Sequence, residues 1–251
     1  MSDLYDQKIH GAYFPPDSSR AVPERYARIV RAGRRFVESS NGRVLEVGPE
    51  VPQIPRYWIG ALGLSPQRAV VADISTAAVK LLQQNGLTAI QADLSTDGLP
   101  FEHGTFDLVI LSEVVEHLTN SDRALVEIHR LLRPGGGLVV TTPNLGGWVN
   151  RIQLLLGLQP IGTETGTEWV FGRGPWVPRA RPVGHLQLLT LRALRELLQY
   201  HSFDLVELEG LPFSADSPGV DRVRRMDRWL CRFPSLASSL MAVAQRRADD
   251  A

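Results

Sequence analysis

Acidic side chains stand where three predicted strands end, and their type and spacing suit the binding of hydroxyl and amine groups. Glu46, Asp73 and Asp93 each fall at the end of a short apolar run. In a doubly wound sheet, the acid that ends the second strand can accept hydrogen bonds from both hydroxyls of a ribose, because an ionised carboxylate only accepts. The acid after the third strand can accept from the exocyclic amine of adenine. These residues predict an adenosine pocket. Gly48 has no side chain, so the ligand can approach the backbone closely there.

Polar residues also follow the fourth predicted strand, which covers residues 106–111. This strand is a run of bulky apolar residues, typical of a strand that helices cover on both faces. The polar residues after it are Ser112, Glu113, Glu116 and His117. Open α/β sheets bind ligands just beyond the carboxyl ends of their strands. We therefore expect the functional site at this edge of the sheet.

Strands and helices alternate along this part of the chain. The predicted strands cover residues 43–47, 69–73, 88–92, 106–111 and 138–142. The predicted helices cover residues 22–39, 54–64 and 76–85, and a last one starts at Ser121 or Asp122, carries Leu132 on its apolar face and ends at Pro134-Gly135-Gly136. Strands separated by helices of this length predict βαβ units and a parallel sheet.

Several motifs, taken in their order, resemble one enzyme family. They are RVLEVGP, VVADIS, AIQADLS, LPFEHGTFDLVILSEVVEHL and LLRPGGGLVVTTPN. The chain is similar in these motifs to the class I S-adenosylmethionine-dependent methyltransferases, and among them to the type 11 group of ubiquinone- and menaquinone-pathway enzymes. The resemblance is good over residues 40–145, and it is weaker over residues 184–210 and in the closing SLASSLMAVAQRR, which resembles the family's last strand.

The resemblance implies an α/β fold with a Rossmann-like, doubly wound sheet of seven strands. The sheet would be mostly parallel with its last strand antiparallel, and helices would cover both faces. S-adenosylmethionine is the implied cofactor. Its implied binding residues are Glu46, Gly48, Asp73, Ile74, Asp93, Leu94 and Ser112.

The first loop departs from the family pattern. The family usually reads acidic-x-Gly-x-Gly-x-Gly there, whereas Gly48 is followed by Pro49, Glu50, Val51 and Pro52. Only the first glycine is present, so the later positions lack glycine's backbone freedom. An alternative function is therefore a non-catalytic cofactor-binding or interaction protein that keeps the fold.

Segments that flank the motifs are expected to bind the substrate. Residues 1–40 form a predicted N-terminal cap segment and helix, and residues 41–251 the methyltransferase domain. Within that domain, residues 145–183 are an insertion too long for an ordinary connection, and long loops of this kind are often lids. Residues 220–247 are expected to hold a helix and the final strand. The predicted substrate residues are Tyr13, Asn144, Trp148 and Trp169, although the tryptophans could instead fill a small satellite core.

The chemistry implied by the cofactor is an in-line methyl transfer from a sulfonium. The protein must align the acceptor, exclude water and, for a hydroxyl acceptor, remove a proton. His117 and His185 are the candidate general bases, because histidine titrates near neutral pH. Alternatively, each ring braces a turn. We expect a small-molecule acceptor that is methylated on oxygen, such as a sugar or glycolipid precursor, a quinone-like ring or a secondary metabolite, with nitrogen, carbon and protein acceptors as alternatives.

Composition and missing motifs argue against several other classes. The 251 residues carry 27 basic and 27 acidic side chains, which gives no electrostatic reason to bind nucleic acid. A nicotinamide dehydrogenase would need a G-x-G-x-x-G turn, and an amino-directed nucleic-acid methyltransferase an Asn/Asp-Pro-Pro-aromatic element after the fourth strand; neither is present. The single Cys231 excludes a cysteine-cluster zinc site, and no metal is expected.

The sequence also bears on location. It shows no apolar run long enough to span a membrane, so we expect a cytoplasmic protein without stable membrane insertion. Residues 221–233 hold five arginines, two aspartates and apolar residues at helical spacing. They predict an amphipathic helix, whose basic face is either solvated or in peripheral contact with a membrane.

Overall fold

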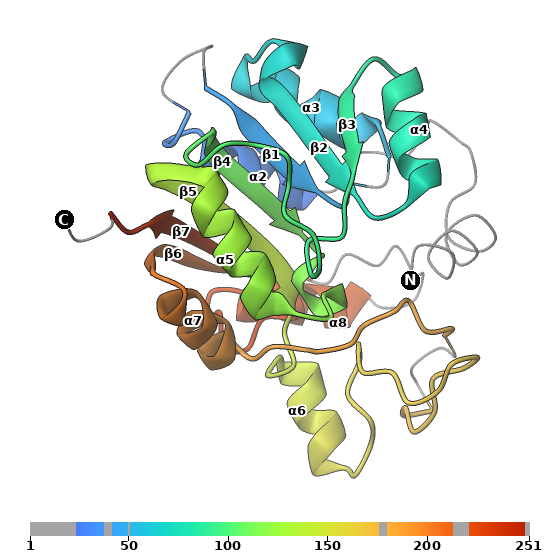
Figure 1. Cartoon of the computed structure of the whole chain (residues 1–251). Coiled ribbons are helices and arrows are strands. Elements are labelled where there is room, and N and C mark those ends of the chain that lie inside the picture. Colours follow the sequence, from blue (N-terminus) through green and yellow to red (C-terminus); the bar gives the residue numbers. More distant parts are fainter. Residues whose placement is uncertain (1–23, 38–41, 50, 176–179, 213–220, 249–251) are drawn as a thin grey trace.

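A seven-stranded sheet forms the centre of the protein, in the order β3-β2-β1-β4-β5-β7-β6. The computed structural model describes residues 24–37, 42–49, 51–175, 180–212 and 221–248. The strands are β1 Val44–Val47, β2 Ala69–Asp73, β3 Thr88–Gln91, β4 Phe106–Ser112, β5 Leu132–Pro143, β6 Phe203–Leu211 and β7 Ser239–Arg246. Strands β1 to β5 are parallel, and β7 runs antiparallel to β5 and β6 (Figure 1). The predicted fold class is confirmed.

Helices cover both faces of this sheet. They are α2 Glu24–Gly33, α3 Gln53–Leu62, α4 Thr76–Gln84, α5 Ser121–Leu131, α6 Trp148–Leu155, α7 Leu191–Tyr200 and α8 Asp221–Leu230, with 3-10 turns η1 Pro66–Arg68 and η2 Val115–His117. Apolar residues of α2, α3 and α4 form one core cluster with the sheet, and those of α5 and α7 form the other. In Figure 1, α5 lies in front of the sheet and α2 behind it. Within the described part of the chain, no helix is long and apolar enough to cross a membrane.

Local capping explains where several helices begin. The Ser75 hydroxyl accepts the Ala78 N–H at 3.1 Å and starts α4. The Asn120 side chain accepts the Arg123 N–H at 2.9 Å, so α5 begins at Ser121, one of its two predicted starts. Such caps satisfy backbone donors that have no partner inside a helix.

The end of α5 differs from the prediction. We expected the helix to carry Leu132 and to end at Pro134-Gly135-Gly136, but it ends at Leu131 and Leu132 begins β5. The residue before a proline avoids the helical conformation because of the proline ring, and here that residue is Arg133. Gly135 has φ 76°, and the register of β5 against β4 shifts in this region. The residues that were predicted to end the helix therefore form the irregular first part of the long strand β5.

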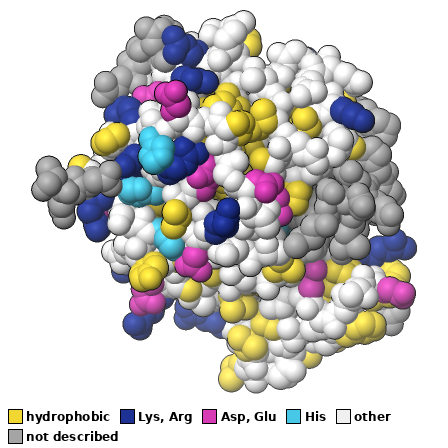
Figure 2. Space-filling view, in the orientation of Figure 1, with side chains coloured by type: hydrophobic (Ala, Val, Ile, Leu, Met, Phe, Trp, Pro, Cys, Tyr) yellow, Lys and Arg dark blue, Asp and Glu magenta, His cyan; other side chains and the backbone are white. Residues whose placement is uncertain are grey.

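The flanking segments partly match their predictions. The N-terminal helix was predicted over residues 22–39, and α2 covers Glu24–Gly33; residues 22, 23, 38 and 39 lie outside the described residues. The insertion, residues 145–183, contains α6, which projects away from the sheet in Figure 1. Apolar side chains gather at that end of the molecule in Figure 2, and Leu155 of α6 is 86% exposed.

The strand ends converge on one edge of the sheet. The parallel strands β1, β2, β4 and β5 all finish there. Pro143 at the end of β5 pairs with Ser239 at the start of β7, and Ser239 pairs with Leu211 at the end of β6. The end of β6 and the start of β7 therefore lie at the same edge as the carboxyl ends of the parallel strands.

Candidate functional site

Two of the predicted acids lie at the carboxyl ends of the neighbouring strands β2 and β3. Asp73 ends β2 and is only 4% exposed, and its Oδ1 accepts the Ser75 N–H at 2.9 Å. Asp93 follows β3, and its Oδ1 accepts the Ser95 N–H at 2.9 Å. The Ala92 N–H donates to the Asp73 carbonyl at 3.0 Å, which ties the two strand ends together. The structure thus brings these carboxyl groups to adjacent positions along the edge.

The two apolar residues predicted for the cofactor site follow these acids directly. Ile74 is partly exposed, whereas Leu94 is buried in the core between the sheet and α5. Ile74 is therefore placed to contact a ligand at the edge. Leu94 supports the turn that carries Asp93.

Gly48 directly follows β1, the strand next to β2, at a position that favours glycine. Its φ is 69°, a left-handed conformation that other residues adopt at a cost. A Cβ atom there would lie 2.9 Å from Cγ2 of Val114, closer than normal contact. The Gly48 N–H donates to the Ala72 carbonyl at 2.8 Å. Val114 thus occupies the space beside the Gly48 Cα atom, so both the packing and the backbone conformation favour glycine at this turn.

Glu46 does not lie at the edge with the other acids. It is fully buried on β1, where its two oxygens accept the Tyr26 hydroxyl of α2 at 2.8 Å and the Trp58 Nε1–H of α3 at 2.5 Å. The strand has only one residue after it, but its side chain faces the two helices. The geometry therefore favours a role in holding α2 and α3 on the sheet, in place of the predicted cofactor contact. Burial raises the pKa of this carboxyl to about 7.

Stability should depend on the protonation of Glu46. Because its pKa is 4.5 in a solvated chain and about 7 when folded, the folded protein binds the extra proton between these values, and the free energy of unfolding falls as pH rises through that range. The expected loss is roughly 3 kcal/mol. Glu46→Gln keeps the size, can accept from Trp58 and stays neutral, so it should flatten the profile by that amount. Urea unfolding of both proteins from pH 4.5 to 7 measures this, and two parallel profiles would contradict it.

A chain of hydrogen bonds runs from α2 to the first residue after β4. The Arg25 Nε–H donates to the Ser112 hydroxyl at 3.0 Å, Ser112 bonds the Thr141 hydroxyl at 3.1 Å, and Thr141 donates to Glu113 at 2.9 Å. Because the arginine only donates, Ser112 is free to donate onward to Thr141. Glu113 has φ 59°, a strained conformation for a non-glycine residue that is often found at functional sites.

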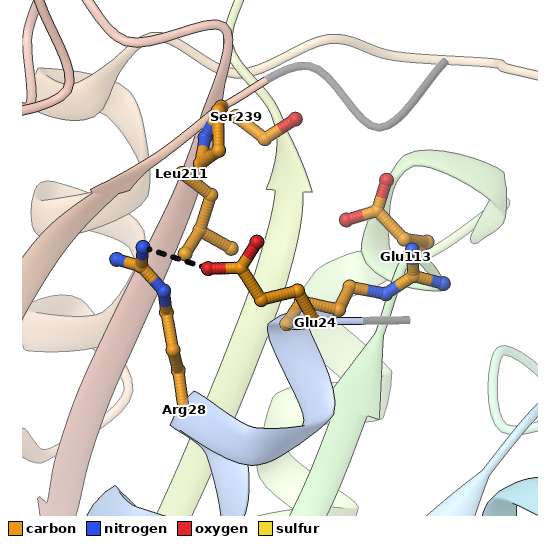
Figure 3. A pocket seen from close by; sticks show the side chains of 7 residues that line it. Glu24, Arg28, Glu113, Leu211 and Ser239 are labelled. Carbon is orange, nitrogen blue, oxygen red and sulfur yellow. Dashed lines mark hydrogen bonds and ion pairs between the residues drawn. The ribbon is translucent and has the colours of Figure 1, made fainter. Parts of the chain in front are cut away.

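A small cavity of about 100 Å³ opens beside Glu113 at the same edge. Its lining residues are Glu24, Arg25, Arg28, Glu113, Leu211, Pro212 and Ser239. Figure 3 shows Glu113 facing the region where Arg28 and Glu24 form an ion pair. The lining comes from α2, the end of β6 and the start of β7, so tertiary packing assembles it. Charged groups of both signs suit a polar acceptor here.

Both predicted histidines lie together at this edge, although 68 positions separate them in the sequence. The ring centroids of His117 and His185 are 4.8 Å apart, at an interplanar angle of 55°. Nδ1 of His117 bonds the Gly184 carbonyl at 3.0 Å, and Nδ1 of His185 bonds the Gly162 carbonyl at 2.8 Å. Burial, helped by the neighbouring His185, lowers the pKa of His117 to about 4. Its ring is therefore neutral at neutral pH.

Glu116 lies next to this histidine pair and was not among the predicted site residues. Its side chain is fully buried, and its Oε2 accepts the Thr142 hydroxyl at 3.1 Å. Its Oε1 is buried without a hydrogen-bond partner among the described residues. Burial and the nearby Glu113 raise the pKa of the Glu116 carboxyl well above its ordinary value.

Asn144 is buried and makes all its side-chain hydrogen bonds to the backbone. Its amide nitrogen donates to the Ala237 carbonyl at 2.8 Å, with longer contacts to two preceding carbonyls, and its oxygen accepts the Gly146 N–H at 2.9 Å. The side chain is 1% exposed. It therefore ties the end of β5 to the turn before β7, and the geometry does not support the predicted contact with substrate.

Asn144→Ala should act on stability. It would leave the buried Ala237 carbonyl and Gly146 N–H without these partners, at an expected cost of about 2–4 kcal/mol. The affinity for S-adenosylhomocysteine should be unchanged in the fraction that remains folded. Urea unfolding and calorimetry measure the two quantities. Asn85→Ala, which removes an exposed bond to a helix carbonyl, is the control and should cost less than about 1 kcal/mol.

The remaining predicted substrate residues are distributed over the insertion and the N-terminus. The Trp148 Nε1–H donates to Asp227 of α8 at 3.0 Å, so this ring joins α6 to α8. Trp169 is 43% exposed, and the Arg181 guanidinium lies 5.6 Å from the centre of its ring. Tyr13 lies outside the described residues. Of these two tryptophans, Trp169 is exposed and Trp148 is partly buried.

Sequence reasoning missed Arg25, Glu113 and Glu116 as members of the site. The two glutamates were visible as polar residues after a buried strand, but no pattern indicated the positive φ of Glu113 or the unsatisfied oxygen of Glu116. Arg25 lies 87 residues before its partner Ser112, and only the packing of α2 brings it to the edge.

Comparisons with known proteins agree with this architecture. The profile of the methyltransferase domain family matches residues 20–208, most of the chain. The chloroplastic tocopherol O-methyltransferase of Arabidopsis thaliana is 27% identical over 168 residues, 59% of this chain and 46% of that protein. A ubiquinone/menaquinone biosynthesis C-methyltransferase of Blochmanniella pennsylvanica is 37% identical over 79 residues, 28% of this chain and 30% of that protein. The matches thus span less than half the length of these curated relatives.

A solved structure shows the same fold. The crystal structure of an S-adenosylmethionine-dependent methyltransferase from Mesorhizobium loti covers 85% of this chain and 95% of its own, with a TM-score of 0.56 and 20% sequence identity. At that identity the likeness concerns the fold alone.

Proposed function

Because the chain belongs to the methyltransferase domain family, whose cofactor is S-adenosylmethionine, we propose that it transfers a methyl group to an oxygen atom of a small molecule. The observation that carries the proposal is the pair His117 and His185 beyond β4, at the edge that also holds Asp73. An oxygen acceptor needs its proton removed, and the neutral imidazole of His117 can support that step.

The residues that would hold the cofactor line the adjoining part of the edge. Asp73 would accept from the ribose hydroxyls and Asp93 from the adenine amine, and the backbone at Gly48, which has no side chain, would lie close to the cofactor. Ile74 would pack against the adenosine, and Ser112 would contact the methionine end. When bound, the cofactor supplies an electrophilic methyl group on a sulfonium, whose leaving group is neutral.

The residues of the chain have four tasks in this reaction. Asp73 and its neighbours position the methyl donor, and the cavity beside Glu113 holds polar parts of the acceptor. His117 keeps a lone pair at neutral pH because burial and His185 lower its pKa to about 4. The insertion, residues 145–183, would act as a lid that excludes water over this edge. Alignment and water exclusion supply most of the rate in such a displacement.

The insertion also bears on the class of acceptor. Exposed apolar residues of α6 and the Trp169–Arg181 pair favour an acceptor with an apolar or ring portion next to an anionic or hydroxyl group. A quinone-like ring, a glycolipid precursor or a secondary metabolite has this chemistry. The named relatives are a tocopherol O-methyltransferase and a ubiquinone/menaquinone biosynthesis C-methyltransferase, so a carbon acceptor is the nearest alternative.

A peripheral contact with a membrane would fit such an acceptor. Met226, Trp229 and Phe233, in and just after α8, are each about half exposed. They share this segment with several arginines, which is the composition of a helix that lies at a membrane surface. We include this contact in the proposal as a route for an apolar acceptor to reach the site.

One observation favours a second candidate function. Glu50 and Pro52 stand in the first loop where the family usually has further glycines, and Pro52, the N-cap residue of α3, makes no side-chain hydrogen bond. Such a loop favours weak cofactor binding, or a protein that has the fold and does not catalyse methyl transfer. Binding measurements separate the two candidates.

The proposed function is tested in two steps with the intact chain. Calorimetry with S-adenosylmethionine and S-adenosylhomocysteine should show one site per chain for each compound. Metabolite extracts incubated with the protein and methyl-labelled cofactor should then yield a labelled product, which mass spectrometry identifies. A protein that binds neither compound would contradict the proposal. Binding without any labelled product in a broad set of extracts would favour the non-catalytic candidate.

A further inference from the structure

We propose that Glu116, His117 and His185 form a binding site for one divalent transition-metal ion, although the sequence suggested no metal. One potential ligand atom from each residue lies within 4.8 Å of the others. Within the described ranges of the chain, this is the single group of at least three histidine, cysteine or acidic residues with such a spacing. Two imidazoles and one carboxylate are a common ligand set for first-row transition metals.

The hydrogen bonds of the two histidines orient their second nitrogens. Nδ1 of His117 and Nδ1 of His185 each bond a backbone carbonyl, which can only accept. Both Nδ1 atoms therefore carry the proton, and in the neutral rings the lone pair is on Nε2. Histidines that bind metals usually have this arrangement, in which a backbone carbonyl holds the non-ligating nitrogen and sets the tautomer.

Glu116 supplies the third ligand and has the same kind of support. Its Oε2 is held by the Thr142 hydroxyl at 3.1 Å, whereas its Oε1 is buried and lacks a hydrogen-bond partner among the described residues. A buried carboxylate oxygen without a partner is costly to the folded state. A bound cation would provide the missing interaction and compensate the charge of the carboxylate.

Backbone contacts bring the two parts of the site together before any ion binds. The N–H groups of Leu186 and Gln187 donate to the Glu116 carbonyl at 2.8 and 3.2 Å, and the Gln187 side chain donates to the Val115 carbonyl at 3.1 Å. These bonds fasten the start of the segment that follows the insertion to the turn η2. His185 is therefore fixed beside Glu116 and His117 by structure that does not itself depend on the ligands.

The spacing fits an ion after a small adjustment. Ligands of one transition-metal ion at their usual bond lengths can be at most roughly 4.2 Å apart. The widest separation in the site therefore has to shrink by about half an ångström, which rotation of partly exposed His185 can provide. The nitrogen ligands favour zinc, cobalt, nickel or iron(II) over magnesium, which prefers oxygen ligands.

The ion would have a function in the reaction proposed above, and this part of the inference rests on that function. Three protein ligands leave at least one coordination position open. An acceptor hydroxyl that occupies it would have a lowered pKa and would release its proton to solvent near neutral pH. The ion would also fix the oxygen in place beside the cofactor pocket.

Metal binding can be measured without methyl transfer. The protein, without a histidine tag, is stripped with a chelator and titrated with Zn²⁺ by calorimetry and with Co²⁺ by visible absorption. We expect one ion per chain and cobalt ligand-field bands of a low-coordinate site. His185→Gln and Glu116→Gln should each weaken binding by about a hundredfold or more. His103→Gln, which changes an exposed histidine outside the site, should leave binding unchanged.

The outcomes distinguish this inference from the proposed function. No stoichiometric binding, or equal binding by wild-type protein and His185→Gln, would overturn the metal site. If Glu116→Gln does not fold, His185→Gln still decides, because that side chain is partly exposed. Calorimetry with S-adenosylhomocysteine on the metal-free protein tests the cofactor site separately. Cofactor binding without metal binding would overturn only the metal site, and metal binding without cofactor binding would contradict only the proposed function.

Discussion

His117→Gln is expected to lower kcat for methyl transfer by about a hundred- to ten-thousandfold, the range typical for loss of an acid–base group. Glutamine has a similar size and can still donate to the Gly184 carbonyl, but it lacks a basic nitrogen. The result is expected whether the imidazole takes the proton itself or holds an ion that acidifies the acceptor. The affinity for S-adenosylhomocysteine should stay within about twofold, because Asp73 ends β2 and Gly48 follows β1, whereas His117 lies in η2 after β4.

His185→Gln should have a comparable effect, and the double variant should be little worse than either single one. Residues that act as one unit show such non-additivity. His103→Gln is the control and should retain full activity. Steady-state kinetics with the acceptor found in the extract screen measure these effects. If both single variants at the site work at wild-type speed, the histidines have no part in the reaction, and alignment alone would have to account for it.

Asp73→Ala is expected to weaken cofactor binding by about ten- to a hundredfold. The lost charge-assisted hydrogen bonds to the ribose hydroxyls are worth roughly 1.5–3 kcal/mol. Asp73→Asn is the matched variant, since it can still accept the Ser75 N–H but is no longer an ionised acceptor for both hydroxyls. It should weaken binding less than alanine. Asp93→Ala should also have a smaller effect, because only the adenine edge is involved.

Calorimetry with S-adenosylhomocysteine measures these affinities, and circular dichroism checks that each variant is folded. A folded Asp73→Ala protein with wild-type affinity would exclude Asp73 as the ribose ligand. The cofactor pocket would then have to be sought elsewhere along the edge. Equal losses in Asp73→Ala and Asp93→Ala would mean that the two acids contribute through their shared negative charge and not through specific contacts.

Glu46 and Asn144 show that a polar residue near a strand end does not necessarily point toward a ligand. Both residues were predicted to reach a ligand because they stand near the ends of strands. Glu46 instead accepts from Tyr26 and Trp58, and Asn144 bonds the Ala237 carbonyl. A strand alternates its side chains between two faces, so a polar residue near the end can point into the helix layer as readily as toward the edge. The helices that pack on that layer decide which partner it finds.

The sequence by itself determined the order of the elements, the sheet and the edge that carries the site. Apolar periodicity and caps such as Ser75 are local signals, because they depend on residues within one or two helical turns. The same local signals located Asp73, Asp93 and Gly48 at strand ends. The prediction that Pro134-Gly135-Gly136 ends a helix was wrong, because these residues lie inside β5.

Only the tertiary structure decided which side chains meet at that edge. His117 and His185 approach to 4.8 Å because backbone bonds fasten the later segment to the Glu116 carbonyl. Arg25 reaches Ser112 because the apolar face of α2 packs on the sheet. These contacts join residues far apart in the chain, and each depends on how whole elements pack. No local pattern of residue types contains that information, because packing is decided by the sum of many apolar contacts across the fold.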